Sequence, residues 1–192
     1  MKIKGASIIK SLLIITILFI VFAFGTYFLK NYLYNNSKDS LTIKSNYNLV
    51  IELDNILPIS DQLALENNKD TVSGEVFKNI QFEVINNHSS SLNYELYITK
   101  EEKEEHEIDG KYIKMFLTKQ NGDLLNGFSS DTVPCYDDLN AISDLPGSRI
   151  LYRGTINGNS TEKFDFKTWI SDKYRNFDED EEFIYSIRVR VI

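Results

Sequence analysis

The strongest constraint on the fold is an alternation of apolar and polar side chains with a period of two, repeated in short runs. The last run, Phe183–Val191, reads FIYSIRVRV and is the clearest example. Successive side chains of a β-strand point to opposite faces, so such runs predict strands with one buried face. Further strands are expected over residues 48–53, 80–84, 92–98, 111–118, 149–156 and 164–170.

The segments between these runs predict how the strands connect. Residues 86–91 form a polar turn cluster, so the strands on either side of it are expected to be an antiparallel pair. Asn121-Gly122 predicts a tight reversal after the 111–118 run. Only residues 60–68 and 171–182 are suited to a short helix. The predicted fold is therefore mainly β, an antiparallel two-sheet sandwich over residues 47–192.

The N-terminal segment has a different character. Ser11–Leu29 carries no charge and, as a helix rising about 1.5 Å per residue, would extend about 28 Å, close to the thickness of a bilayer core. The lysines before it place the N-terminus inside under the positive-inside rule. We therefore expect a basic cytoplasmic segment (1–10), a transmembrane or signal-anchor helix (11–33), a stalk (34–46) and an extracellular domain (47–192).

Two other interpretations of this segment stay open. A signal peptidase could cut after Ala23-Phe24-Gly25, before Thr26, which would give a secreted protein, although an uncleaved anchor is favoured. Lys4-Gly5 before an apolar helix has the outline of a prepilin leader, and a pilin-like subunit is the less favoured result. Such leaders carry a glutamate where this chain has Lys10.

Charge argues against a nucleic-acid-binding protein, and the cysteine content excludes a domain held by internal disulfides. Five of the 21 basic residues precede the first acidic residue, Asp39. Residues 39–192 therefore carry 16 basic against 28 acidic residues, a net charge of −12. That balance repels phosphate backbones, so we expect no nucleic-acid partner. The single cysteine, Cys135, cannot form an internal disulfide; it could pair between chains, but a free and partly buried cysteine is favoured.

A succession of motifs resembles a group of uncharacterised surface proteins of Gram-positive bacteria, distantly similar to the TasA and camelysin group of biofilm-matrix proteins. The motifs are Gly25-Thr26-Tyr27, Leu53-Asp54-Asn55, Pro58–Asp61, Phe82–Asn87, Leu92–Leu96, Ile108–Lys114, Leu151–Ile156 and Phe166–Asp172. The resemblance implies an exported, jelly-roll-like sandwich. In the matrix members it also implies fibre assembly by a strand passed between subunits, and camelysin-like members are sometimes called metallopeptidases.

The residues themselves offer few candidate sites. The only histidines are His88 and His106, and His106-Glu107 lacks the second histidine of a zinc helix motif, so we expect neither a zinc site nor an enzyme. The acidic run 178–182 supplies weak calcium candidates, Asp178, Asp180 and Glu182, without the spacing of an EF-hand. Trp169 is expected in the core rather than exposed for ligand contact.

The favoured function is a structural or assembly role for a single-pass cell-surface protein, with no cofactor. Its partners would be the lipid bilayer through the N-terminal helix and, through sheet edges, itself or other surface proteins. The alternative is a module that binds a glycan, a peptide or calcium. A secreted metallopeptidase is less favoured.

Overall fold

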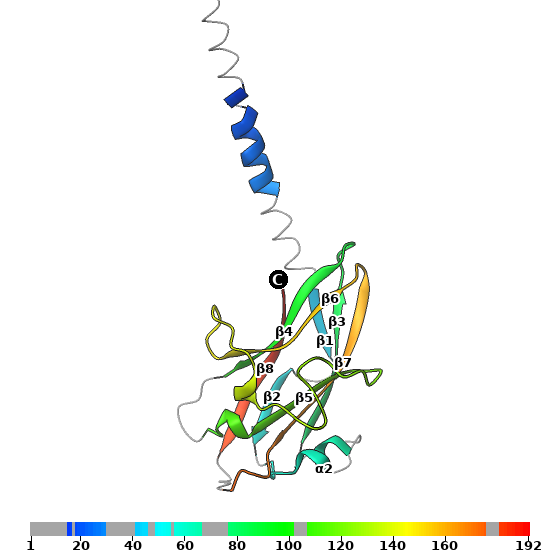
Figure 1. Cartoon of the computed structure of the whole chain (residues 1–192), viewed down its shortest axis with the longest axis vertical. Helices are drawn as coiled ribbons and strands as arrows, with labels where there is room; N and C mark the ends of the chain where they lie inside the picture. Colours follow the sequence, from blue (N-terminus) through cyan, green and yellow to red (C-terminus); the bar gives the residue numbers. More distant parts are fainter. Residues whose placement is uncertain are drawn as a thin grey trace, which may run out of the picture. The chain divides into compact units, whose positions relative to one another are not determined.

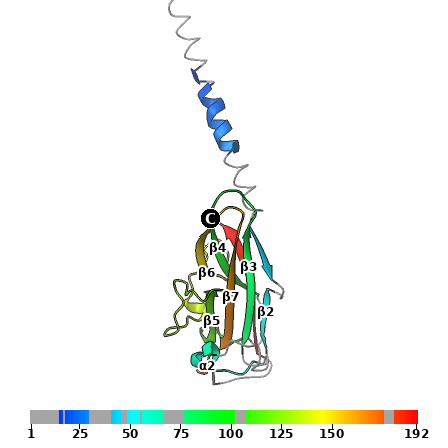
Figure 2. The same cartoon turned by 90° about the vertical axis from the view of Figure 1, so that its right-hand side faces the viewer.

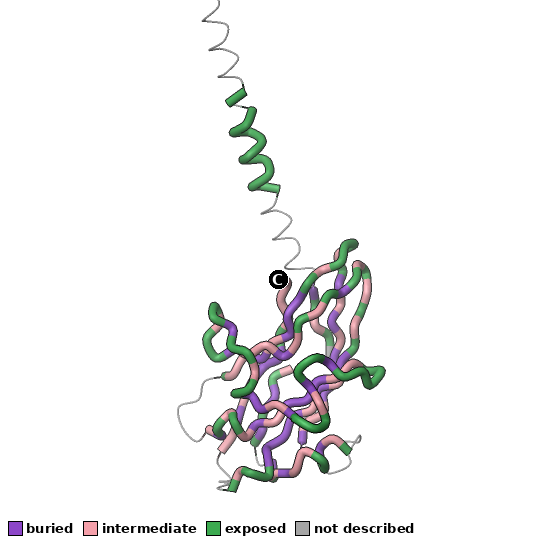
Figure 3. The backbone as a smooth tube through the Cα atoms, in the orientation of Figure 1, coloured by how far each residue is buried: buried purple, intermediate pink, exposed green. Residues whose placement is uncertain are grey.

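The computed structural model describes residues 15–16, 18–29, 41–45, 49–54, 56–66, 77–101, 107–175 and 181–192. The chain divides into two compact units, Met1–Asp39 and Ser40–Ile192. In the first unit, residues 15–16 and 18–29 are helical and their side chains are exposed (Figure 3). The remainder of the expected 11–33 helix lies outside the described residues. Within the described ranges, no helix combines the length and apolar character required to span a bilayer.

The second unit contains two four-stranded sheets, in which every strand pair is antiparallel (Figures 1 and 2). Sheet A has the order β1 (Leu41–Ser45), β3 (Lys78–Asn86), β7 (Ser160–Ile170), β5 (Ile113–Lys119). Sheet B has the order β2 (Val50–Asp54), β8 (Glu182–Val191), β4 (Leu92–Lys100), β6 (Ser148–Ile156). The prediction of a mainly β, antiparallel fold is confirmed.

Odd-numbered strands form one sheet and even-numbered strands the other, so each connection between consecutive described strands passes between sheets. The expected pairing of the 80–84 run with the 92–98 run is therefore wrong: β3 pairs with β1 and β7, and β4 with β6 and β8. The side-chain amide of Asn86 helps to fix this crossing. It donates to the carbonyl oxygens of Ser90 (2.9 Å) and Asn157 (3.0 Å), which joins the β3–β4 connection to the β6–β7 connection.

The inward side chains of both sheets belong to one hydrophobic core. Phe82 and Phe164 stack within sheet A, with ring centroids 5.4 Å apart. Phe166 of sheet A meets Tyr185 of sheet B edge to face at 6.3 Å. Figure 3 shows this burial as alternating colours along the strands. Aromatic side chains remove the most apolar area from water, so they dominate the stabilisation of this core.

Three local elements differ in detail from the sequence expectations. Part of the expected stalk is β1, which pairs with β3, and the compact unit accordingly begins at Ser40 rather than at residue 47. The expected helix within 60–68 is α2 (Asp61–Glu66). The expected 111–118 strand starts late because Asp109 caps a 3₁₀ turn, η1 (Gly110–Tyr112), by accepting a hydrogen bond from the Lys111 N–H.

The reversal at Asn121-Gly122 is confirmed. Gly122 has φ +85°, in the region that only glycine adopts freely, and its N–H donates to the Lys119 carbonyl at 2.8 Å. A second 3₁₀ turn, η2 (Tyr136–Asp138), lies in the long connection between β5 and β6.

Candidate functional site

The outer face of sheet A carries a pocket of about 600 Å³, which we call the sheet A pocket. Its floor is formed by Asn79 of β3, Phe116 and Thr118 of β5, and Asp165 and Lys167 of β7. Residues of the 120–130 segment and Leu65 of α2 form its walls. These positions alternate with the core residues of the same strands, so the period of two turns them away from the core.

Strand register brings the floor residues together. Lys167 stands opposite Asn79 on one side and Phe116 on the other, and Asp165 stands opposite Thr118. Directly opposite Cβ atoms in antiparallel strands are about 5 Å apart and diagonal neighbours about 7–8 Å apart. Asn79 and Asp165 are therefore diagonal neighbours across the β3–β7 pair.

Two acceptor atoms in this pocket lack partners. Asn79 Oδ1 and Asp165 Oδ1 are both buried and receive no hydrogen bond from any residue that the structure describes. A buried acceptor without a donor costs roughly 1–3 kcal/mol, and more where the group is charged.

Lys167 brings a positive charge to the same floor. Its Nζ donates to the carbonyl oxygens of Ala64 (3.3 Å) and Leu65 (3.5 Å) in the last turn of α2 and lies 5.8 Å from the ring centroid of Phe77. Burial lowers the pKa of Lys167, and the Asp165 charge partly opposes this. The floor thus combines one cation and one carboxylate with the apolar ring of Phe116.

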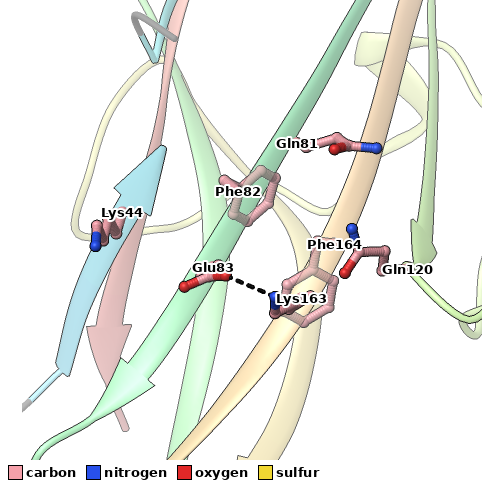
Figure 4. A pocket seen from close by; sticks show the side chains of 7 residues that line it. All are labelled: Lys44, Gln81, Phe82, Glu83, Gln120, Lys163 and Phe164. Carbon is pink, nitrogen blue, oxygen red and sulfur yellow. Dashed lines mark ion pairs between the residues drawn. The ribbon is translucent and has the colours of Figure 1, made fainter. Parts of the chain in front are cut away.

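A second hollow of about 260 Å³ lies on the same face and shares Gln120 with the sheet A pocket. Figure 4 shows Glu83 of β3 reaching to Lys163 of β7, and the Nζ–Oε1 distance of this ion pair is 3.0 Å. Lys44 of β1 lies apart from this pair in the same view. The two hollows therefore lie next to each other on the outer face of sheet A.

Sheet B offers an unpaired backbone edge at the end of β6, next to a pocket of about 420 Å³ between residues 150–153 and the 126–140 segment. The Ile192 N–H donates to the Asn93 carbonyl at 3.0 Å, so the backbone of Asn93 faces β8. Two directly opposite residues of an antiparallel pair either hydrogen-bond each other through their backbones or both direct their backbone N–H and C=O groups to the opposite sides. Thr155 is opposite Asn93, so the N–H and C=O of Thr155 point away from β4, off the edge of the sheet. The same holds for Arg153. Neither backbone is hydrogen-bonded to another described residue on that side.

The first half of β6 is covered. The Ile150 N–H donates to the Asn140 carbonyl at 2.9 Å, and Ala141 bridges to Arg149. The open part of the edge is thus limited to the end of β6 beyond this loop.

The calcium candidates of the acidic run remain a prediction, since only Glu182 lies among the described residues. Asp178, Asp180 and His106 lie outside the described residues, and Glu182 is the first residue of β8, paired opposite Asp54. Where the structure describes the chain, no three His, Cys, Asp or Glu side chains are grouped so as to hold a metal ion. His88 is engaged in the β3–β4 connection, where its Nδ1 lies 2.6 Å from Ser90 Oγ.

The two other singled-out residues behave as expected. Cys135 is free and buried, and burial raises the pKa of its thiol, with Asp138 adding to this. Trp169 points to the outer face of sheet A but is fully buried, and its indole N–H donates to Asp61 Oδ1 of α2 at 3.1 Å. The core assignment of Trp169 is confirmed.

No protein-family model matches the chain, and no curated protein matches it significantly. Sequence reasoning did not find the sheet A pocket. The alternation marks Asp165 and Lys167 as outward residues between Phe164 and Phe166, and that was the available signal. Their neighbour Asn79 comes from a strand about 80 residues earlier in the chain, and only strand register unites them.

Proposed function

We propose that this chain is a membrane-anchored cell-surface protein whose extracellular domain is a jelly-roll-like β-sandwich with a structural or assembly role. The uncharged Ser11–Leu29 segment, its preceding lysines and the exposed apolar side chains of the helical residues support the anchor. The core shared by the two sheets supports the sandwich. The relationship to the TasA and camelysin group remains a prediction.

The observation that carries the assembly role is the open end of β6. Arg153 and Thr155 direct backbone donors and acceptors away from β4, and an unpaired strand edge can accept a strand from another chain. The exposed Arg153 side chain is already held by Glu95, so it does not block the edge. A second copy of this chain or another surface protein would extend sheet B at this position.

Cross-linking in cells tests this role. Thr155→Pro removes an N–H that has no backbone partner among the described residues, so the fold is expected to persist while pairing at the edge is lost. Thr155→Val is the matched control, since it also loses the hydroxyl that donates to Asn93 Oδ1 but keeps the backbone N–H. We expect cross-linked species in the wild type and in Thr155→Val but not in Thr155→Pro. A wild-type chain that yields no cross-linked neighbour contradicts the proposal.

The localisation is tested separately. Protease added to intact cells should digest the domain from Ser40 onward, and the intact mass of the membrane-extracted chain should match the full 192 residues. A mass that begins at Thr26 would favour the secreted alternative. A domain that resists protease until the cells are lysed contradicts extracellular placement.

A further inference from the structure

We infer that Asn126-Gly127 is a site of self-modification, at which the folded chain converts its own asparagine into an aspartate or an isoaspartate. The inference rests on a contrast between the three Asn-Gly steps of the sequence, at 121–122, 126–127 and 157–158. Hydrogen bonds and close packing restrain the first and the last step, whereas the reacting groups of the central step have no hydrogen-bond partner among the described residues. It does not depend on assembly at the β6 edge, because the reaction takes place within one chain.

The reaction needs only these two residues and water. The Gly127 nitrogen attacks the side-chain carbonyl carbon of Asn126, a bond forms between them, and the Cγ–Nδ2 bond breaks. The proton of the Gly127 N–H is transferred to the departing nitrogen, which leaves as ammonia, and a succinimide ring remains. Water then opens the ring: cleavage of the Cγ–N bond gives aspartate, and cleavage at the main-chain carbonyl gives isoaspartate. Glycine favours the attack because it has no side chain to obstruct its nitrogen.

Asn126 and Gly127 are the central residues of an exposed turn. The Phe128 N–H donates to the Leu125 carbonyl at 3.0 Å, which closes the turn around them. The Asn126 side chain and the Gly127 N–H make no hydrogen bond to any residue that the structure describes. Gly127 has φ +94°, and apart from its two chain neighbours a Cβ placed there would meet no atom within 4 Å. The attacking nitrogen and the carbonyl carbon are therefore free to approach each other in the folded protein.

The Asn121-Gly122 step is held in its unreacted form by hydrogen bonds. Asn121 Oδ1 accepts the Asp123 N–H at 3.1 Å, and Asn121 Nδ2 donates to Asp123 Oδ2 at 2.7 Å. The Gly122 N–H, which would have to attack, donates to the Lys119 carbonyl at 2.8 Å. Ring closure has to displace both groups from these partners, so this step should react about tenfold more slowly than Asn126-Gly127.

The Asn157-Gly158 step is held by packing between two connections. The Asn157 carbonyl accepts a hydrogen bond from Asn86 Nδ2 at 3.0 Å, and Asn157 Oδ1 accepts one from the Ser91 hydroxyl at 3.3 Å. Gly158 lies so close to Ser89 that a Cβ there would be 2.1 Å from the Ser89 carbonyl oxygen. These contacts oppose the rotation of the main chain that brings the Gly158 nitrogen to the side chain, so this step should also react slowly.

The product changes the charge of a defined surface. Asn126 and Gly127 line the pocket of about 420 Å³ beside β6, together with Asp138 and Arg153. Each of the two products adds one carboxylate to this pocket, and isoaspartate also lengthens the main chain there by one carbon. The folded protein therefore ages into a more acidic form that differs at this one position.

Peptide mass spectrometry on the full-length chain in detergent tests the inference. The folded protein is incubated in mildly alkaline buffer, which promotes loss of the glycine N–H proton, and the deamidated fraction is followed at all three steps. We expect position 126 to accumulate aspartate and isoaspartate about tenfold faster than positions 121 and 157. In concentrated urea the three steps should react at similar rates, because the restraints on the other two are then lost.

Two variants identify the position on the intact protein. Asn126→Gln lengthens the side chain by one methylene, which disfavours ring closure, so ion-exchange chromatography should show that the acidic form no longer accumulates. Asn121→Gln is the matched control: it makes the same change at a restrained step and should accumulate the acidic form like the wild type. The inference is overturned if position 126 reacts no faster than the other two in the folded protein, or if Asn126→Gln accumulates the acidic form at the wild-type rate.

Discussion

Arg190 Nε donates a hydrogen bond to Glu95 Oε2 at 2.7 Å on the outer face of sheet B, although Glu95 is only 1% exposed. Arg153 Nε donates to the other carboxylate oxygen, Glu95 Oε1, at 2.6 Å. A second nitrogen of Arg190, Nη1, lies 3.1 Å from Asp144 Oδ2. Because Arg153 belongs to β6 and Arg190 to β8, the carboxylate on β4 joins three adjacent strands. Charge-assisted hydrogen bonds from two arginines compensate the burial of this one negative charge.

Replacing Glu95 should destabilise the domain. Glu95→Ala leaves two arginines without their shared acceptor, and we expect a loss of about 2 kcal/mol because both guanidinium groups remain partly hydrated. Glu83→Ala, which breaks the more exposed ion pair with Lys163, should cost only about 0–1 kcal/mol. Urea unfolding of the two variants checks the difference, and equal losses would contradict the special role of Glu95.

The same carboxylate should make stability depend on pH. Burial alone would raise the pKa of Glu95, but the hydrogen bonds from Arg190 and Arg153 outweigh it and lower the pKa below the ordinary value of 4.5. The unfolded chain therefore takes up a proton at higher pH than the folded chain does. The stabilisation is fully present above pH 4.5 and is lost as the pH falls through the folded-state pKa.

Urea midpoints measured from pH 7 down to the acid range check this dependence. The wild type should lose stability on acidification below the ordinary pKa of a glutamate. Glu95→Gln, which cannot ionise, should start lower and show a shallower acid decline. A decline as steep as that of the wild type would assign the effect to other carboxylates, such as Asp138, whose pKa is also lowered, chiefly by its hydrogen bond with Cys135.

Cys135 should be unreactive in the folded protein. Its side chain is buried and burial raises the pKa of the thiol, so little thiolate is available near neutral pH. We expect an aromatic disulfide reagent to label Cys135 slowly without denaturant and rapidly and stoichiometrically in urea. Rapid labelling of the native protein at neutral pH would show that the segment around η2 opens readily.

Gly158 should tolerate no side chain. A Cβ at this position would lie 2.1 Å from the Ser89 carbonyl oxygen, because the β6–β7 and β3–β4 connections touch here. Gly158→Ala should therefore cost about 1–3 kcal/mol, as overpacking does. Asn159→Gly is the control in the same turn: Asn159 has φ 52°, which glycine adopts without strain, so its stability should stay close to that of the wild type. Thermal unfolding of both variants distinguishes the contact from general sensitivity of the turn.

The strands themselves could be predicted from the sequence because alternation is a local property. The run at 149–156 became β6 (Ser148–Ile156), and the final run became β8 (Glu182–Val191), with Phe183 and Tyr185 in the core as the pattern requires. The inward and outward faces of β7 also follow from its sequence, including the outward positions of Asp165 and Lys167. A side-chain period of two needs no knowledge of neighbouring strands.

Tertiary structure alone decided which strands became neighbours. The 86–91 turn cluster was compatible with a hairpin, yet it carries the chain from sheet A to sheet B, where both β3 and β4 bury their apolar faces against one core. Register then placed Asn79 beside Asp165 and Lys167, and α2 covered Trp169 although its strand position faces outward. Sequence determined which face of each strand is apolar, because that depends on successive residues. Pairing, register and the sheet A pocket depend on burying all those faces together, and no single segment encodes that.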